Sequence, residues 1–244
     1  MNGDVIILAD PELMAAAAAA RLITALVDAQ AARGHAHLVV TGGTGGAAVQ
    51  QAVAACAARD AVDWAAVDVW WGDERFLPSG DPERNETQAR GFLLDALPLD
   101  PARMHPMPAS DGAFGDDVDA AAAGYAAELA AAATPGSALP VFDVLLLGVG
   151  PDGHVASLFP GHPGFAVHEG TAIAVRNSPK PPPTRISLTL PALQTARQTW
   201  LLATGEGKAD VVGRALGGEA LPSGSVHGTE RTLWLLDRAA AAKL

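Results

Sequence analysis

The chain has 244 residues and a formal net charge of −11, from 16 Lys and Arg against 27 Asp and Glu. This acidic excess argues against nucleic acid and anionic membranes as partners, because both require a positive protein face. A hydrophobic content of 49% excludes wholesale disorder. The lone cysteine, Cys56, excludes an internal disulfide framework and indicates a reducing compartment, for which we expect the cytoplasm.

The first half of the chain alternates short β-branched runs with alanine-rich stretches. Residues 5–8 predict a strand, and Asp10-Pro11-Glu12 predicts the start of a helix that ends at Gly34. Arg21 interrupts the apolar part of this helix, which falls short of the ~20 apolar residues that a membrane span needs. The elements expected next are strands at 37–40 and 67–71 and helices at 47–58, 85–97 and 117–133.

The second half begins with the clearest strand, residues 142–147. Further strands are expected at 172–175, 186–190, 200–203 and 232–235, with a helix at 208–216 between the last two. This alternation predicts an α/β fold with a mostly parallel sheet that helices cover on both faces. We expect one domain over residues 1–244, with small excursions near 105–115 and 177–184. Because open parallel sheets bind ligands at the carboxyl ends of their strands, the informative residues should directly follow strands.

A glycine-rich segment, Thr41-Gly42-Gly43-Thr44-Gly45-Gly46, lies between a predicted strand and a predicted helix. Glycines allow a sharp turn and a close approach to a ligand, and the following helix start offers free N–H groups that suit a phosphate. The segment lacks the Gly-Lys-Ser/Thr of a nucleotide-binding loop. It therefore predicts an anion site, and a plain glycine-rich turn is the alternative.

A second turn, residues 148–157, follows the clearest strand and contains His154. Its glycines match the spacing of a dinucleotide fingerprint, but Pro160, Gly161 and Pro163 break the helix that such a fingerprint would open. Because an imidazole titrates close to neutral pH, His154 is a candidate for proton transfer, and Asp152 could orient its ring. The alternative is a structural histidine that donates to a backbone carbonyl.

The remaining candidates are polar residues that also follow strands. Asp73 and Arg75 come directly after the strand at 67–71, where they could equally form a solvated turn. A proline-stiffened loop carries Lys180 and Arg185, and Lys208 stands at a helix start after Gly205. No histidine or cysteine spacing predicts a metal site.

In their order along the chain, these motifs resemble the family of 6-phosphogluconolactonases and glucosamine-6-phosphate deaminases. The resemblance covers essentially the whole chain and implies a Rossmann-like three-layer α/β/α sandwich. It also implies that Gly42, Gly43 and Thr44 bind a sugar phosphate, with Arg185 and Lys208 as a cationic clamp. Asp73 and Arg75 would line the sugar site, and His154 would transfer the proton. The matching motifs are residues 41–44, 72–75, Asn85, 148–157, 180–182 with Arg185, and 205–208.

Two positions favour the lactonase branch of this family. Phe159 stands where the deaminases carry a glutamate that assists ring opening, and Arg75 stands where they tend to carry an aromatic residue. The implied reaction is hydrolysis of 6-phospho-D-glucono-1,5-lactone to 6-phospho-D-gluconate in the oxidative pentose phosphate pathway. Water would attack the lactone carbonyl with His154 as general base, and backbone N–H groups near residues 150–153 are candidate donors to the oxyanion.

No cofactor is expected for this reaction, because a lactone is already activated toward water. The expected partner is the small sugar-phosphate substrate, and the chain would be a monomer or a small homo-oligomer. Two other interpretations stay open: a sugar-phosphate isomerase or deaminase on the same scaffold, and a sugar-phosphate sensor without catalysis.

Overall fold

The computed structural model describes residues 3–244, whose main feature is a seven-stranded sheet in the order β1-β10-β9-β6-β2-β3-β5. All neighbouring strands of this sheet are parallel. The central pair β6 and β9 is joined in register from Val144 opposite Gln198 to Gly148 opposite Leu202. The strands are β1 (Asp4–Leu8), β2 (Ala36–Val40), β3 (Val67–Trp71), β5 (Met104–His105), β6 (Val144–Gly148), β9 (Gln198–Ala203) and β10 (Arg231–Asp237).

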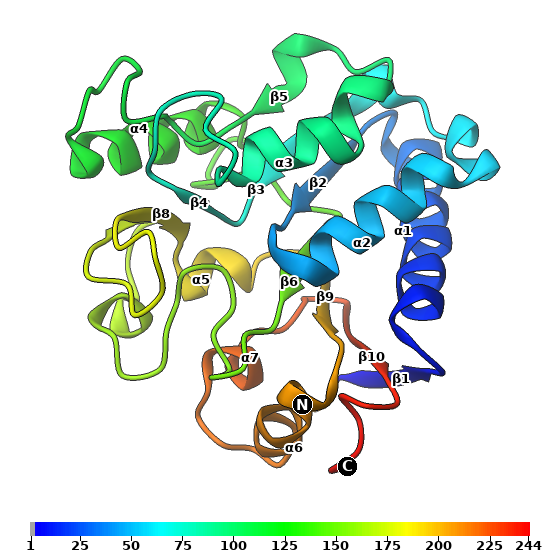
Figure 1. Ribbon diagram of the computed structural model, residues 1–244. Coiled ribbons are helices and arrows are strands. Elements are labelled where there is room, and N and C mark those ends of the chain that lie inside the picture. The colour runs from blue at the N-terminus through cyan, green and yellow to red at the C-terminus, as the bar shows by residue number, and fades with distance from the viewer. Residues whose placement is uncertain (1–2) are drawn as a thin grey trace.

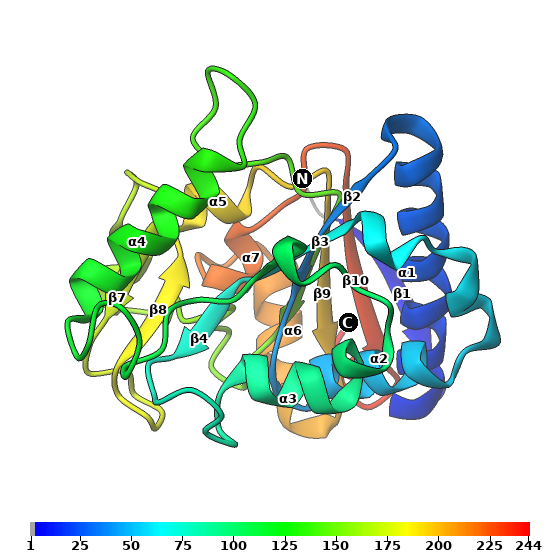
Figure 2. The same cartoon turned by 90° about the horizontal axis from the view of Figure 1, so that it is seen from above.

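Helices flank this sheet, as predicted. Figure 2 shows α1 on one side of β9 and β10 and the pair α6 and α7 on the other. In Figure 1, α2 lies beside α1, and α3 follows α2 toward the upper part of the molecule. The helices are α1 (Pro11–Arg33), α2 (Gly43–Ala55), α3 (Asn85–Phe92), α4 (Val118–Ala131), α5 (Leu190–Leu193), α6 (Ala209–Leu216) and α7 (Pro222–Ser225).

Helix α1 shows how local sequence sets the element ends. Asp10 accepts a hydrogen bond from the Leu13 N–H at 2.8 Å, Pro11 occupies the first turn, and Gly34 ends the helix with a φ of 78°. These are the start and stop signals that the sequence predicts. The predicted start of α2 was wrong, because α2 begins at Gly43 rather than at residue 47. The glycines of the anion-site motif are thus the first turn of the helix itself.

A second, antiparallel sheet contains β4 (Asp73–Arg75), β8 (Arg185–Leu188) and β7 (Ala172–Val175) in that order. The sequence places strands near β7 and β8, but the motif at 72–75 was expected to be a loop, and instead it forms β4. The linking segment 176–184 is shorter than the dozen or so residues of a parallel crossover, so β7 and β8 pair antiparallel. In Figure 1, α4, β4 and β8 form the left part of the molecule.

A charged cluster joins β3, β5 and α4 outside the lining of the cavity that is described below. His105 stacks on Trp70 with ring centroids 3.8 Å apart, and its ring nitrogens lie 3.1 Å from Asp68 and 2.9 Å from Glu128. Burial alone would lower the pKa of His105, but the hydrogen bonds to Asp68 and Glu128 outweigh it and raise the pKa to about 9. His105 is therefore charged at neutral pH.

The raised pKa of His105 predicts a loss of stability in alkali. The unfolded histidine has a pKa of 6.5, so the contribution of His105 is fully present below pH 6.5 and is lost as the pH rises through about 9. We expect the free energy of unfolding, measured in urea, to fall over this interval. The His105→Gln variant should show a flatter profile there, and an unchanged slope in that variant would contradict the assignment.

Candidate active site

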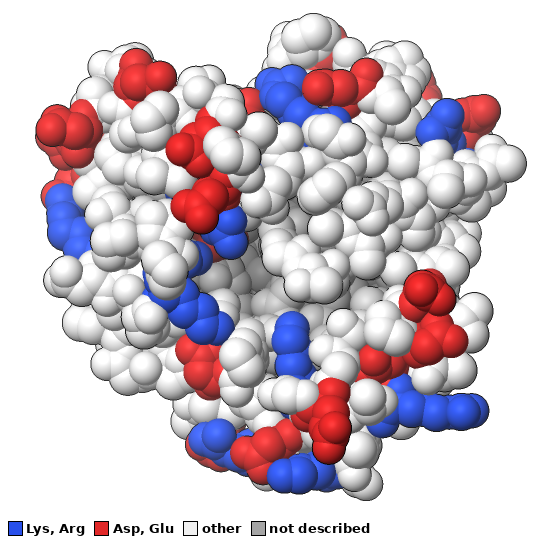
Figure 3. All heavy atoms as spheres, in the orientation of Figure 1, with Lys and Arg blue, Asp and Glu red and all other residues white. Residues whose placement is uncertain are grey.

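A cavity of about 350 Å³ opens between the two sheets at the carboxyl end of the main sheet. Figure 3 shows it as a hollow near the centre of the face, with Lys and Arg side chains on its rim. The local positive charge contrasts with the acidic excess of the chain as a whole. Its walls contain Thr41, Gly42, Gly43, Thr44, Gly45, Asp73, Arg75, Asn85, Gly148, Val149, Gly150, Pro151, His154, Ala156, Lys180, Pro181, Arg185 and Lys208.

The start of α2 forms one wall of the cavity. Gly43 has a φ of 75°, which a side chain would disfavour, and a Cβ on Gly42 would overlap Oδ1 of Asn85. These glycines let the chain enter the helix directly beneath the cavity. The first N–H groups of a helix lack partners inside the helix and carry a partial positive charge, so this wall suits an anion.

The turn after β6 also lines the cavity and carries His154. The Gly150 N–H donates to the His154 carbonyl at 2.9 Å, and the Gly153 N–H donates to the Gly150 carbonyl at 3.0 Å. A Cβ on Gly150 would overlap the imidazole, so only glycine lets the ring lie across this turn. The other side of the ring packs on Phe159, with centroids 4.5 Å apart. The turn thus fixes the position of the imidazole.

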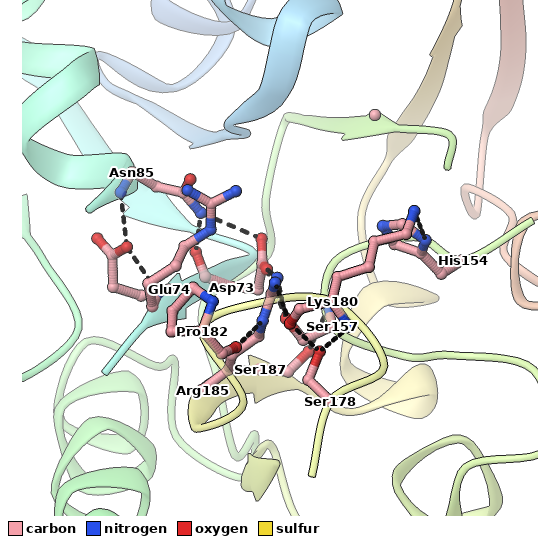
Figure 4. Close-up of polar contacts among 12 residues, drawn as sticks. Asp73, Glu74, Asn85, His154, Ser157, Ser178, Lys180, Pro182, Arg185 and Ser187 are labelled. Carbon is pink, nitrogen blue, oxygen red and sulfur yellow. Dashed lines mark hydrogen bonds and ion pairs between the residues drawn. The ribbon is translucent and has the colours of Figure 1, made fainter. Parts of the chain in front are cut away.

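His154 Nδ1 lies 2.5 Å from Asp152 Oδ1. Asp152 is thus placed to orient the ring, which is one role that its position in the sequence suggested. Burial alone would raise the pKa of Asp152, but the hydrogen bond and charge of His154 and the charge of Lys180 hold it well below its ordinary value. Asp152 is therefore ionised and accepts the Nδ1 proton, which leaves Nε2 as the basic nitrogen. Figure 4 shows His154 and the long side chain of Lys180 lying alongside each other.

Lys180 approaches the same pair. Its Nζ lies 3.4 Å from Asp152 Oδ1 and 3.3 Å from His154 Nδ1. Lys208 lies at the start of α6, and the pKa of its ammonium is lowered by burial and by the charge of Lys180. The two lysines line the same cavity, and an anion bound there would relieve their mutual repulsion.

Asp73 in β4 and Arg185 in β8 both contact Ser157, which lies in the turn after β6. The Ser157 hydroxyl donates to Asp73 Oδ2 at 2.6 Å, and Arg185 Nη1 lies 3.4 Å from the same hydroxyl and 3.8 Å from Asp73 (Figure 4). Arg185 is only 4% exposed and donates to the carbonyls of Lys180, Pro181 and Pro182. Much of its hydrogen-bonding capacity therefore holds the proline loop in place at the cavity wall.

The structure thus brings together every residue that the sequence assigned to the site except Asp152, which supports His154 from just outside the cavity lining. Arg75 lines the cavity, and its Nη1 donates to the Glu83 carbonyl at 2.6 Å. Sequence reasoning did not assign a role to Ser157 or Asn85, although both belong to the motifs. The Asn85 amide donates to the Asp73 carbonyl at 2.8 Å.

Glu74 was missed because its neighbours in the sequence suggested an exposed turn. It is fully buried and accepts hydrogen bonds from the N–H groups of Arg75, Asn85 and Glu86. Glu74 lies in β4 and thereby caps the start of α3 from a different element. A local sequence pattern cannot reveal such a contact. Burial raises the pKa of Glu74 to about 7, against the opposing effects of Arg84 and of these three amides.

Removing this cap should be costly. We expect Glu74→Ala to lower the free energy of unfolding by about 3 kcal/mol, because it leaves the amides of Asn85 and Glu86 without their acceptor and removes a buried carboxylate 3.8 Å from the buried Arg84 guanidinium. Urea denaturation measures the loss. Asp95→Ala removes an exposed carboxylate from the same region and should change stability by less than about 0.5 kcal/mol. Equal effects of the two variants would contradict the capping role.

Within residues 3–244, no group of His, Cys, Asp and Glu side chains is arranged to hold a metal ion. Across the same residues, no helix has the length and apolarity that crossing a bilayer requires.

The fold and the site together define an α/β protein with a cationic cavity and a histidine–aspartate pair at the carboxyl edge of its parallel sheet. The chain belongs to the family of glucosamine-6-phosphate isomerases and 6-phosphogluconolactonases, whose model matches residues 9–234.

Several relatives are similar over the full length. A 6-phosphogluconolactonase of Streptomyces coelicolor is 62% identical over 240 residues, which cover 96% of this chain and 92% of that protein. A 6-phosphogluconolactonase of Mycobacterium tuberculosis is 49% identical over 247 residues, with coverage of 100% and 99%. The resemblance seen in the sequence is thereby confirmed at the level of the family.

Solved structures share the fold. A 6-phosphogluconolactonase of Trypanosoma brucei superposes with a TM-score of 0.84 at 26% identity, covering 99% of this chain and 98% of that one. A monomeric glucosamine-6-phosphate deaminase superposes with a TM-score of 0.81 at 18% identity, covering 99% and 100%. Because both activities occur on this fold, the fold alone does not choose between them.

Proposed function

We propose that this chain hydrolyses 6-phospho-D-glucono-1,5-lactone to 6-phospho-D-gluconate. The observation that carries the proposal is the pairing of His154 Nδ1 with Asp152 at 2.5 Å, beside a cavity that His154 lines together with the start of α2 and Lys208. The 62% identity to a 6-phosphogluconolactonase supports the same substrate. The arrangement supplies a base for water at one wall and a phosphate site at the other.

The phosphate would bind the N–H groups at the Gly42–Thr44 end of α2 and the ammonium of Lys208. This contact is remote from the reacting carbon, so its binding energy positions the lactone ring against His154. Asp73 and Arg75 line the space between the two walls, where the ring hydroxyls would lie. Arg185 holds the proline loop and adds positive charge to the wall.

In the reaction, His154 Nε2 takes a proton from water while the water oxygen bonds to the lactone carbonyl carbon. The ionised Asp152 stabilises the imidazolium that forms. When the tetrahedral intermediate collapses, the bond to the ring oxygen breaks and His154 returns the proton to that oxygen. The product ionises to a carboxylate and releases one proton to the solvent.

Phe159 supports hydrolysis over deamination. Its ring packs against the His154 ring, and the Arg185 guanidinium carbon lies 5.6 Å from the Phe159 ring centroid. Because phenylalanine has no carboxylate, this position cannot assist the ring opening that deamination needs. A coupled dehydrogenase assay should detect rapid formation of 6-phosphogluconate from fresh lactone. An assay of ammonia release from glucosamine 6-phosphate should stay at background. Ammonia release with no lactone turnover would overturn the proposal.

A further inference from the structure

Several backbone amides beside His154 already donate hydrogen bonds within the protein. The Gly150 and Gly153 N–H groups donate within the turn, the Val149 N–H donates to the Leu202 carbonyl at 3.0 Å, and residue 151 is a proline. The sequence suggested the amides near 150–153 as donors to the reaction's oxyanion. The Gly150 and Gly153 amides are not available for that role, which opens it to a side-chain donor of the cavity.

The arginines of the cavity also donate hydrogen bonds to groups of the protein itself. Arg185 donates to three carbonyls of the proline loop, and Arg75 Nη1 donates to the Glu83 carbonyl. Lys208 stands at the start of α6 and lines the cavity together with the glycines of α2.

Lys180 is the cation that lies beside the base. Its Nζ is 3.3 Å from His154 Nδ1 and 3.4 Å from Asp152, and its side chain is 36% exposed. An ammonium has three donors, and the carboxylate of Asp152 does not use them all.

The backbone of Lys180 is held firmly from two directions. Its N–H donates to Ser178 Oγ at 3.3 Å, the Ser178 hydroxyl donates to the Lys180 carbonyl at 2.9 Å, and Arg185 donates to that carbonyl at 3.1 Å. The ammonium is thus carried by an ordered loop to the cavity lining beside the His154–Asp152 pair, and an electrostatic catalyst requires such a fixed position.

We propose that Lys180 is a catalytic residue, whose ammonium donates a hydrogen bond to the lactone carbonyl oxygen as that oxygen becomes an oxyanion. This inference rests on the proposed lactonase function. As the water oxygen bonds to the carbonyl carbon, the π electron pair moves onto the carbonyl oxygen. The Lys180 ammonium donates a hydrogen bond to this negatively charged oxygen. The pair returns to re-form the carbonyl as the ring C–O bond breaks. Lys180 stays protonated throughout, and Lys208 binds the phosphate.

The test separates these two lysines with matched variants, Lys180→Met and Lys208→Met. Two ligands report binding: glucitol 6-phosphate, which has the phosphate but no charge at carbon 1, and 6-phosphogluconate, whose carboxylate occupies the position of the oxyanion. Calorimetry gives the Kd of each ligand, and the coupled assay gives kcat and KM. Retained binding of glucitol 6-phosphate shows that the Lys180→Met variant is folded.

For Lys180→Met we expect kcat to fall roughly 10²–10³-fold, as for the loss of one oxyanion donor. Its Kd for glucitol 6-phosphate should change less than about 3-fold, whereas binding of 6-phosphogluconate should weaken about tenfold or more. Lys208→Met should weaken both ligands by about tenfold or more and raise KM, and its loss of kcat should be smaller than that of Lys180→Met.

The inference is overturned if Lys180→Met keeps its kcat, or if it weakens both ligands equally, as a phosphate contact would. An effect of Lys180 only through the orientation of His154 would lower kcat without changing the ratio of the two Kd values, and this result also overturns it. Failure of the proposed function is distinct, because the wild type would then bind these ligands without hydrolysing the lactone, while the Kd ratio would still test the Lys180 contact.

Discussion

Replacement of His154 by alanine is expected to lower kcat for lactone hydrolysis by about 10²–10⁴-fold, the usual contribution of one general base. The imidazole lies in the cavity with Nδ1 bound to Asp152, so the variant loses the basic Nε2 and retains the phosphate wall. The Kd for glucitol 6-phosphate should therefore change less than about 3-fold. The coupled assay and calorimetry measure the two quantities.

His168 provides the matched control, because it is exposed and outside the cavity. His168→Ala should keep wild-type kcat and KM. If His154→Ala also kept them, His154 would be a structural residue and another group would have to activate water. A parallel rise in KM and in the Kd for glucitol 6-phosphate would instead indicate a binding role.

Gly150→Ala should also produce a large loss of kcat, although it adds a single methyl group outside the reacting residues. The new Cβ would overlap the His154 ring and crowd the Asp152 carboxylate, so the ring must move away from the position that the turn gives it. A displacement of about 1 Å in a catalytic group can cost about 10²-fold in rate, and we expect kcat to fall by that order.

The effect of Gly150→Ala should be confined to catalysis. Gly150 does not have a positive φ, so the loss would come from contact with the imidazole rather than from backbone strain. Gly91→Ala in α3 is the control, because a Cβ there meets no neighbour within 4 Å and alanine favours a helix. Gly91→Ala should keep full activity with equal or higher stability. Wild-type kcat in Gly150→Ala would show that the ring tolerates another position.

Much of the site could be predicted because its residues follow strands of a parallel sheet. Residues 41–46 follow β2, the turn with His154 follows β6, and Lys208 follows β9, so each lies at the same edge of the sheet. Hydrophobic runs identified these strands, and glycines marked the turns. The pairing of Asp152 with His154 was foreseeable from their proximity in the sequence.

What the sequence did not reveal depends on contacts between distant segments. Glu74 and Asn85 are joined only when β4 packs against the start of α3, and the Ser157 hydroxyl reaches Asp73 only across the boundary between the two sheets. The antiparallel sheet itself was missed because β4 is short and highly polar, without a hydrophobic run to mark it. Such contacts follow from tertiary packing and have no local signature.

The central claim is that this cavity hydrolyses a lactone that its phosphate site has positioned. The most direct measurement compares proton release in a pH-stat from fresh 6-phosphogluconolactone and from gluconolactone without the phosphate. We predict rapid hydrolysis of the phosphorylated lactone and a kcat/KM lower by on the order of 10³-fold for the other, because several charge-assisted hydrogen bonds are lost. A phosphorylated lactone that decays only at its spontaneous rate, or equal kcat/KM for both, would contradict the account.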